Sequence, residues 1–342
     1  MEEYKPPFSI NDDIINTIAE ISELIGHISV TSGLSSNPKL RRINRIKTIQ
    51  ASLAIENNTL SLEQVTALLN GKRIAGSVQE IREVKNAYET YNRLTKFNPL
   101  KIKDLLSAHA ILMDGLVEGA GKFRHSGVGV FDGEHVVHMA PPSDLVPELI
   151  RNLLKWYKQS NLHPLVKSIV FHYEFEFIHP FADGNGRMGR LWHTLLLMQW
   201  KKILAWVPVE SLVKERQQDY YAALGRADKL ADSTCFIEFM LAAMRDTLKN
   251  IVQSDQENDY VSDHVSDHVK EHVNSLLKIL GDRALSIAEM MEMLHMKHRP
   301  TFRKNYLNPA LQSGVIEMTI PDKPRSRNQK YKKKNIHYTK RA

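Results

Sequence analysis

The sequence predicts a mainly α-helical protein with one β-hairpin and a small C-terminal unit that ends in two strands. Apolar residues recur at helical spacing through most of residues 40–252. One segment, residues 127–142, instead carries β-prone runs on both sides of Asp132-Gly133, the usual signal for a two-residue hairpin turn. Beyond about residue 252 the chain becomes polar, and a second helical pattern with a basic end follows.

The composition is that of a globular protein with enough sequence for a hydrophobic core. The chain has 342 residues, of which 42% are hydrophobic and 25% are charged. No apolar run approaches the roughly 18 residues that a membrane span requires, and the first residues lack the basic and apolar regions of a secretory signal. The single cysteine, Cys235, excludes an internal disulfide. We therefore expect a cytoplasmic protein with no membrane contact.

The first part of the chain is expected to consist of successive helices. The first clear pattern covers residues 40–56, and a capping box of Ser61 and Gln64 opens a short second helix that Gly71 ends. The following helices are expected at residues 78–94, 101–116, 144–159, 164–178, 186–200, 217–230 and 234–252. The hairpin lies among them, and because a two-stranded hairpin is only marginally stable alone, it needs a surface to lie on.

The C-terminal part is predicted to begin at residues 253–268 with a linker or a loosely formed helix start, in which the tetrapeptide SDHV repeats. His264 and His268 have a spacing that would suit a metal on a helix, but a solvated helix face accounts for it and is preferred. A capping box of Ser286 and Glu289 opens one of the helices that follow. These helices are expected at residues 269–281, 286–296 and 299–314, and a strand, a turn and a second strand at residues 315–333.

The positive charge is concentrated at the C-terminus. Residues 322–342 hold nine basic residues and one acidic residue, a net charge of +8, so the rest of the chain contributes −1 to the total of +7. Any contact with nucleic acid therefore belongs to this end of the chain.

The C-terminal unit resembles a winged helix-turn-helix in its pattern of elements, with the basic residues 324–334 as the wing. The exposed residues of its recognition helix are then Arg299, Thr301, Arg303 and Lys304. This resemblance implies DNA contact through residues 299–341. Two alternatives stay open, because such modules also bind proteins and a basic end can simply be solvated.

The most informative stretch is HPFADGNGRMGR, residues 179–190. Pro180 cannot lie inside a helix, so the preceding helix ends at or near His179. Gly184 and Gly186 are expected to form a tight turn whose N–H groups converge, and the next helix begins directly there. A glycine turn at a helix N-terminus is an anion site that suits phosphate.

Four side chains of this stretch suit phosphoryl-type transfer. Arg187 and Arg190 are three residues apart, so they share one face of the first helical turn and reach the same phosphate chain. Asp183 supplies a carboxylate oxygen, the ligand type that Mg²⁺ prefers and shares with phosphates. His179 has the side chain whose ordinary pKa suits proton removal near neutral pH. Together they would hold a magnesium nucleotide and deprotonate an incoming hydroxyl.

At every defining position this stretch resembles the signature HPFx(D/E)GNGRxxR of Fic-domain proteins, and the resemblance spans roughly residues 35–250. Gly121 and Arg124 supply a GxxR element, and the hairpin precedes the motif as it does in that family. The resemblance implies the Fic fold, a helical domain in which the hairpin is a β-hairpin flap. It also implies that AMP passes from ATP to a hydroxyl of an unidentified target protein or of the chain itself, with pyrophosphate leaving.

The resemblance gives each residue of the motif a role. His179 is the general base, and Asp183 holds Mg²⁺. The anion turn consists of Gly184, Asn185 and Gly186. Arg187 contacts the nucleotide phosphates, Arg190 the γ-phosphate, and Phe181 is a packing anchor for the loop.

Two further contacts follow from the same resemblance. The edge of the flap that pairs with the target segment by strand addition consists of Val136, Val137 and His138. Tyr220 and Tyr221 resemble tyrosines that line the adenosine pocket of the family. Asp228, farther along the same helix, stands where an Asn is usual.

A shorter match lies upstream, where SLAIEN at residues 52–57 fits the inhibitory pattern (S/T)xxxE(G/N) of the family. Ser52 and Glu56 share one helix face, and Asn57 completes the pattern. The resemblance implies that the Glu56 carboxylate pairs with Arg190 and occupies the γ-phosphate site. The enzyme would then be autoinhibited within one chain.

These expectations divide the chain into four parts. Residues 1–95 form an N-terminal helical region with the inhibitory motif, 96–252 the catalytic core, 253–268 a linker, and 269–342 the winged-helix-like domain with its basic tail. The leading hypothesis is an autoinhibited protein adenylyltransferase. An enzyme that removes AMP, and a DNA-binding regulator whose Fic domain senses nucleotide, stay open, as does a homodimer.

Overall fold

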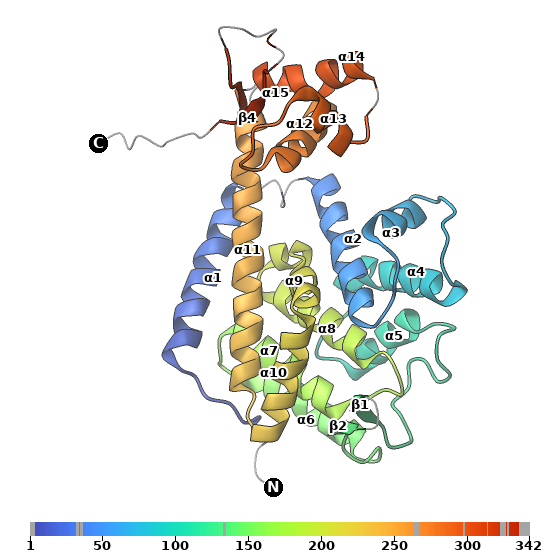
Figure 1. Ribbon diagram of the computed structural model, residues 1–342. Coiled ribbons are helices and arrows are strands. Elements are labelled where there is room, and N and C mark those ends of the chain that lie inside the picture. Colours follow the sequence, from blue (N-terminus) through green and yellow to red (C-terminus); the bar gives the residue numbers. More distant parts are fainter. Residues whose placement is uncertain are drawn as a thin grey trace. The chain divides into compact units, whose positions relative to one another are not determined.

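The computed structural model describes residues 4–31, 34, 37–132, 135–262, 267–296, 298–312, 314–321, 326 and 328–334. The chain divides into two compact units, residues 1–252 and 253–342 (Figure 1). Within the described ranges, no helix is long and apolar enough to cross a membrane. The structure is mainly helical, as the sequence predicts.

The first unit is built from helices and one hairpin. Its first half contains α1 (Asp12–Thr31), α2 (Pro38–Ile55), α3 (Leu62–Leu69), α4 (Val78–Asn92), the 3₁₀ turn η2 (Leu94–Lys96) and α5 (Ile102–Leu112). Its second half contains β1 (Gly129–Asp132), β2 (His135–Met139), α6 (Val146–Gln159), α7 (Pro164–Ile178), α8 (Asn185–Trp200), η3 (Lys202–Trp206), α9 (Val209–Glu215), α10 (Gln217–Leu230) and α11 (Thr234–Ser262). The capping box of Ser61 and Gln64 is confirmed at the start of α3.

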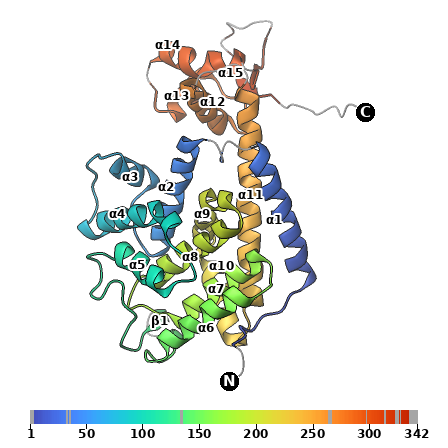
Figure 2. The ribbon, with the colours of Figure 1, turned by 180° about the vertical axis from the view of Figure 1, so that it is seen from behind.

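The centre of this unit is the pair α7 and α8, whose residues are buried along most of their length. α7 contributes to two hydrophobic clusters, one shared with α1, α10 and α11 and the other with α2, α4, α5 and α6. Seen from behind, α2 to α5 lie on one side of α8 and α1, α10 and α11 on the other (Figure 2). Because α7 is buried along most of its length between these two clusters, it gives the loop before α8 a firm support.

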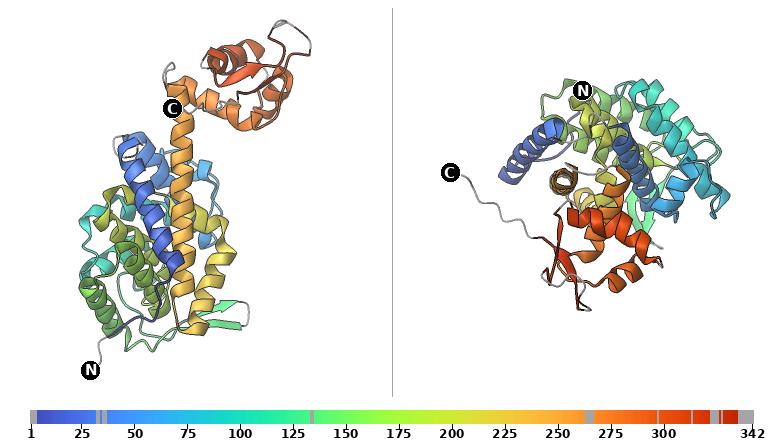
Figure 3. Two further views of the ribbon diagram at one scale, coloured as in Figure 1. Left: turned by 90° about the vertical axis from the view of Figure 1, so that its left-hand side faces the viewer. Right: turned by 90° about the horizontal axis from the view of Figure 1, so that it is seen from above.

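α1 was not predicted as a separate helix. Its buried residues Ile14, Ile21, Ile25 and Ile28 form one stripe, and it runs along the first part of α11 (Figure 3). Lys249 on α11 pairs with Glu20 across this contact. Ile18 is partly buried in the same stripe, so apolar residues recur at helical spacing over residues 14–28, and the sequence does carry the pattern of this helix.

The hairpin is present, but its turn differs from the prediction. Asp132 pairs with His135 and therefore belongs to strand β1 and not to the turn, whereas residues 133–134 lie outside the described residues. The register of the two strands is irregular between Val130 and Phe131, where the pairing shifts by one residue. β2 lies against α10, which provides the surface that a lone hairpin requires.

The second unit has its own hydrophobic core, which includes Val273, Leu276, Met290, Phe302 and Tyr331. It contains α12 (Asp267–Leu280), α13 (Ile287–Met293), α14 (Arg299–Phe302), the π-helical turn η4 (Arg303–Leu307), α15 (Asn308–Gln312) and the antiparallel strands β3 (Ile316–Met318) and β4 (Tyr331–Lys333). The predicted capping box of Ser286 and Glu289 is confirmed. The comparison with a winged helix-turn-helix stays a prediction.

The segment expected to be a linker is helical where the structure describes it. Residues 253–262 continue α11 and residue 267 begins α12, whereas residues 263–266 lie outside the described residues. His264 is one of these residues outside the description, so the spacing of His264 and His268 stays untested.

Candidate active site

The loop between α7 and α8 carries the first part of the candidate site. α7 ends at Ile178, and His179 follows as its C-cap in the left-handed conformation, with φ 49° and ψ 61°. The ring nitrogen Nδ1 of His179 lies 3.1 Å from the carbonyl oxygen of Glu176. Because a carbonyl can only accept, Nδ1 carries the proton and the Nε2 lone pair remains available to accept one.

Asn185 and Phe181 give this loop its shape. The side-chain amide of Asn185 bonds both backbone groups of Phe181, at 2.8 Å and 2.9 Å. The Phe181 ring is fully buried and stacks on His109 at a centroid distance of 3.7 Å. Asn185 was expected in the anion turn, and its side chain also stabilises the loop by bonding to the backbone of Phe181.

His109 is a residue of the site that the sequence did not mark. Its Nδ1 accepts a hydrogen bond from the Gly121 N–H at 2.8 Å, so its Nε2 donates to the Asp183 carbonyl at 3.0 Å. Burial lowers the pKa of His109 and keeps the ring neutral, as this pattern of one accepted and one donated bond requires. In the sequence His109 is marked only by its position near the end of an amphipathic helix. A histidine of the hydrophobic core would have the same position, so the sequence could not distinguish the two.

Arg124 ties the loop to the hairpin. Its guanidinium donates to the carbonyls of His179 at 2.7 Å, of Ser126 at 2.9 Å and of Pro141 at 2.5 Å, and its backbone N–H donates to Pro180 at 3.0 Å. The side chain is almost completely buried. One cation therefore holds the backbone at His179 and at the segments just before β1 and just after β2.

The N-terminus of α8 has the features of an anion site. Gly184 is its N-cap with φ 82°, and a Cβ there would lie 2.6 Å from the sulfur of Met113, so both backbone and space require glycine. The first N–H groups of α8 have no carbonyl within the helix to bond. Gly186, which was expected in the turn, is the second residue of α8, so the tight turn is made by Gly184 alone.

Arg187 lies between two carboxylates. It contacts Asp183 at 3.2 Å and Glu83 of α4 at 3.3 Å. Asn58, two residues after Glu56, donates to the second oxygen of Glu83 at 2.8 Å. Arg187 is buried whereas Asp183 remains exposed, so the aspartate oxygens are open to solvent beside the anion site.

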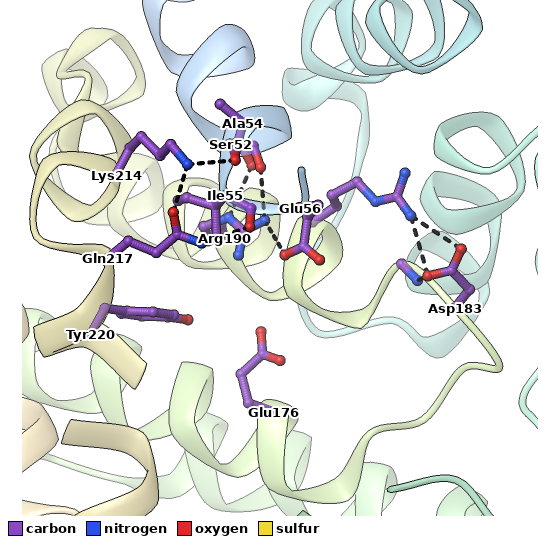
Figure 4. Close-up of polar contacts among 12 residues, drawn as sticks. Ser52, Ala54, Ile55, Glu56, Glu176, Asp183, Arg190, Lys214, Gln217 and Tyr220 are labelled. Carbon is purple, nitrogen blue, oxygen red and sulfur yellow. Dashed lines mark hydrogen bonds and ion pairs between the residues drawn. The ribbon is translucent and has the colours of Figure 1, made fainter. Parts of the chain in front are cut away.

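Arg190 makes an ion pair with Glu56. Its Nη2 lies 2.7 Å from the glutamate Oε1 and 3.0 Å from the Ser52 carbonyl, and its Nε lies 3.0 Å from the Ser52 hydroxyl (Figure 4). The guanidinium is buried and Glu56 is half-buried. Burial lowers the pKa of Arg190, but Glu56, Tyr220 and Glu176 together outweigh it and hold the pKa above its usual value.

Glu56 lies directly over the start of α8. It is the C-cap of α2, and the next residue, Asn57, is exposed with a positive φ of 67°. A Cβ at Gly186 would lie 2.4 Å from Glu56 Oε1. The carboxylate therefore occupies the space beside the N–H groups at which an anion would bind.

Three further side chains hold the end of α2, and two of them, Lys214 and Gln217, were not marked by the sequence. Lys214 of α9 donates to the Ala54 carbonyl at 2.7 Å, and Gln217 of α10 donates to the Ile55 carbonyl at 2.9 Å (Figure 4). The Tyr221 hydroxyl lies 3.5 Å from the same Ile55 oxygen. Lys214 also donates to the Gln217 side-chain oxygen at 2.6 Å, so the two residues act as one unit.

The two tyrosines of α10 differ in their surroundings. Tyr220 is buried against His172, with its hydroxyl 3.2 Å from the histidine Nε2, whereas Tyr221 is partly exposed beside α2. Tyr220 also lines a small enclosed cavity below Arg190, with room for about one water molecule. Burial lowers the pKa of His172 to about 3. Asp228 accepts a bond from Tyr173 at 2.8 Å.

The flap residues Val136, Val137 and His138 lie in β2, and their side chains are outside the described part of the structure. No group of three or more His, Cys, Asp or Glu side chains that could hold a metal occurs among the described residues. The structure thus brings His179, Asp183, Arg187 and Arg190 together on one loop and helix, and places Glu56 from a distant helix against the last of them.

Comparisons with known proteins agree with this arrangement. Residues 99–197 match the Fic/DOC family, and residues 271–333 match the C-terminal domain of proteins described as filamentation induced by cAMP protein Fic-like. The crystal structure of a Fic family protein from Desulfovibrio desulfuricans is 51% identical, with a TM-score of 0.73, and the match covers 98% of this chain and 100% of that one.

Curated relatives are more distant. The chain is 32% identical over 227 residues to the protein adenylyltransferase Fic of Drosophila erecta, a match that covers 62% of this chain and 43% of that protein. It is 26% identical over 270 residues to the protein adenylyltransferase fic-1 of Caenorhabditis elegans, covering 72% and 50%. The chain therefore spans about half the length of the curated relatives it matches.

Proposed function

This chain belongs to the Fic family, and we propose that it is an autoinhibited protein adenylyltransferase that transfers AMP from ATP to a hydroxyl side chain of a target protein or of itself. The single observation that carries the proposal is the placement of His179, with an acceptor nitrogen, beside an anion site flanked by two arginines. The names of the curated relatives support the same activity.

The chemistry follows from the donors and acceptors of the site. His179 Nε2 takes the proton of the target hydroxyl, and the hydroxyl oxygen attacks the α-phosphorus of ATP. The bond between the α-phosphorus and the bridging oxygen breaks, and pyrophosphate leaves with its charge held by the N–H groups of α8 and by Arg187 and Arg190. Arg124 holds the His179 carbonyl, so the ring stays in one position during the transfer.

The residues present fit a magnesium ion. Asp183 offers exposed carboxylate oxygens next to the anion site, and Mg²⁺ is commonly bound by one or two carboxylates together with substrate phosphates. Asp183 would hold the ion, which supplies positive charge to the phosphates. Because Arg187 contacts Asp183, arginine and metal would share one carboxylate.

We also propose which residues contact the adenosine of ATP and the backbone of the target protein. Tyr221, partly exposed near the end of α2, is the tyrosine better placed to contact adenosine, and buried Tyr220 would support it from below. The edge of β2 around Val136, Val137 and His138 would pair with the target backbone by strand addition.

The resting enzyme is proposed to be inhibited by Glu56. Its carboxylate holds Arg190 at 2.7 Å, so the guanidinium is not available to a γ-phosphate. ATP would then bind with its phosphates misaligned for attack. The enzyme becomes active when Glu56 leaves and the phosphates replace its charge.

Incubation with labelled ATP and Mg²⁺ tests the proposal. The Glu56→Gly variant should label itself or an added protein, and mass spectrometry of labelled lysate should locate AMP on a hydroxyl side chain. If the wild-type chain removes AMP from a protein that already carries it, the reverse reaction is the better description of the enzyme. A chain that binds ATP and transfers nothing would instead be a nucleotide-sensing module.

A second function is supported by the exposed basic side chains of the second unit. Arg299, Arg303 and Lys304 are all exposed on the helical stretch from α14 to η4. We propose that they contact the phosphates of duplex DNA, together with the basic end of the chain. This contact would place the transferase near DNA without changing its chemistry.

A further inference from the structure

The last turn of α2 presents carbonyl groups that its own helix cannot fully use. A helix leaves its final four C=O groups without intrahelical partners and carries partial negative charge at that end. In α2 side chains from other helices donate to three of these carbonyls: Arg190 to Ser52, Lys214 to Ala54, and Gln217 to Ile55. Figure 4 shows all three donors gathered around this end of α2.

Two of these donors are independent of the Glu56 side chain. Lys214 and Gln217 bond each other and bind consecutive carbonyls immediately before Glu56. Both are partly buried, so their bonds are shielded from water more than those of a surface pair. They hold the backbone from which the inhibitory carboxylate projects, but they do not touch that carboxylate.

We propose that Lys214 and Gln217 form a latch that holds the end of α2 in place and thereby sets how strongly the site is inhibited. This inference rests on the proposed function and concerns the regulation of the same site. When a nucleotide takes Arg190, the bond from Arg190 to the Ser52 carbonyl is lost together with the Glu56 ion pair. The latch then keeps the end of α2 next to α9 and α10, so that Glu56 can pair with Arg190 again once the nucleotide leaves.

The latch also joins the inhibitory helix to the proposed adenosine contact. Gln217 and Tyr221 are one turn apart on α10, and both reach the Ile55 carbonyl. A base that binds beside Tyr221 therefore meets the side of α10 that holds α2. Release of α2 and binding of the nucleotide base involve the same short stretch of helix.

The test combines hydrogen exchange with transfer rates. Lys214→Met keeps the length and packing of the side chain but cannot donate, whereas Lys214→Arg retains a donor with positive charge. The amides of residues 50–60 should exchange roughly 3- to 10-fold faster in Lys214→Met and return toward wild type in Lys214→Arg. Gln217→Ala should act in the same direction, and the neighbouring exposed Gln218→Ala is the matched control.

Initial rates of transfer from labelled ATP should rise by a similar factor in Lys214→Met. In a Glu56→Gly background the same substitution should leave the rate unchanged, because no inhibition remains to relieve. A gain in rate cannot arise from misfolding.

Two results would overturn the latch. One is unchanged exchange at residues 50–60 in Lys214→Met. The other is a fall in rate when Lys214→Met is added to Glu56→Gly, which would make Lys214 a substrate-binding residue. If exchange quickens while Glu56→Gly itself transfers nothing, the latch stands and the proposed transferase activity is wrong.

Discussion

Arg190 and Glu56 lie 134 positions apart in the sequence and meet at 2.7 Å. Arg190 belongs to α8, the helix whose N-terminus would bind phosphates. Glu56 is the C-cap of α2, a separate helix. A charge-assisted bond to a buried guanidinium is strong, and in the proposed function this contact keeps the site inhibited until a competing anion binds.

The Glu56→Gly variant should transfer AMP on the order of 10 to 100 times faster than wild type, since a hydrogen bond to a charged group contributes about 1.5–3 kcal/mol. Any AMP-removing activity should fall. Arg190→Ala should be inactive, and the double variant should stay inactive because relief of inhibition is useless without the γ-phosphate ligand. Initial rates of all four proteins form the cycle. If Glu56→Gly is no faster than wild type, Glu56 is an ordinary helix glutamate.

His179→Ala, made in the Glu56→Gly background, should bind ATP normally and lose on the order of 10²–10⁴ in rate. The residue lies at a helix end and only its ring nitrogen takes part in the chemistry, so the fold should persist. Calorimetric binding of ATP and single-turnover transfer separate the two effects. Transfer at a near-normal rate would remove His179 from the role of base.

Arg124 should matter through the position of His179 and not through nucleotide binding. Arg124→Lys keeps the charge, but a single ammonium cannot reach the carbonyls of His179, Ser126 and Pro141 together. In the Glu56→Gly background we expect kcat to fall on the order of 10- to 100-fold with little change in KM for ATP. Thermal melting controls for folding. A variant that melts normally and transfers at the parent rate would show that the clamp is dispensable.

The pattern of the sequence was sufficient for the helices around the motif, because Pro180 cannot continue a helix and Gly184 readily adopts the left-handed conformation found there. It was not sufficient for side chains that act through distant backbone. His109, Glu83, Lys214 and Gln217 look like ordinary helix residues, and only the packing of α4, α5, α9 and α10 brings them to the site. Contacts between elements far apart in sequence carry no local signal.

DNA binding by the second unit should weaken steeply with salt, with a log–log slope of about −0.9 for each phosphate contact. Because Tyr331 of β4 is part of the core, charge substitutions are preferable to removal of the whole basic end. Arg299→Gln, Arg303→Gln and Lys304→Gln together should flatten the slope by about 2–3 and leave transfer intact. The exposed Lys278→Gln on α12 is the control. If residues 1–342 do not bind duplex DNA at low salt, a protein partner for the second unit is favoured instead.

Glu174 should give the protein a distinctive dependence of stability on pH. It lies on α7, is buried, and accepts a hydrogen bond from the Tyr4 hydroxyl of the N-terminal segment. Burial raises its pKa to about 7, from 4.5. The folded protein therefore binds more protons at this site than the unfolded chain between these two values, so its contribution to stability is present below pH 4.5 and is lost as the pH rises to about 7.

Glu174→Gln should remove this dependence. Its free energy of unfolding relative to wild type should rise by roughly 1–3 kcal/mol between pH 4.5 and 7.5, as measured in urea. Tyr4→Phe removes a bond that lowers the pKa of Glu174, so the loss of stability should extend to higher pH in that variant. Parallel stability curves for wild type and Glu174→Gln would mean that Glu174 titrates alike in the folded and unfolded chain, and that its carboxylate stays in contact with water beside Tyr4.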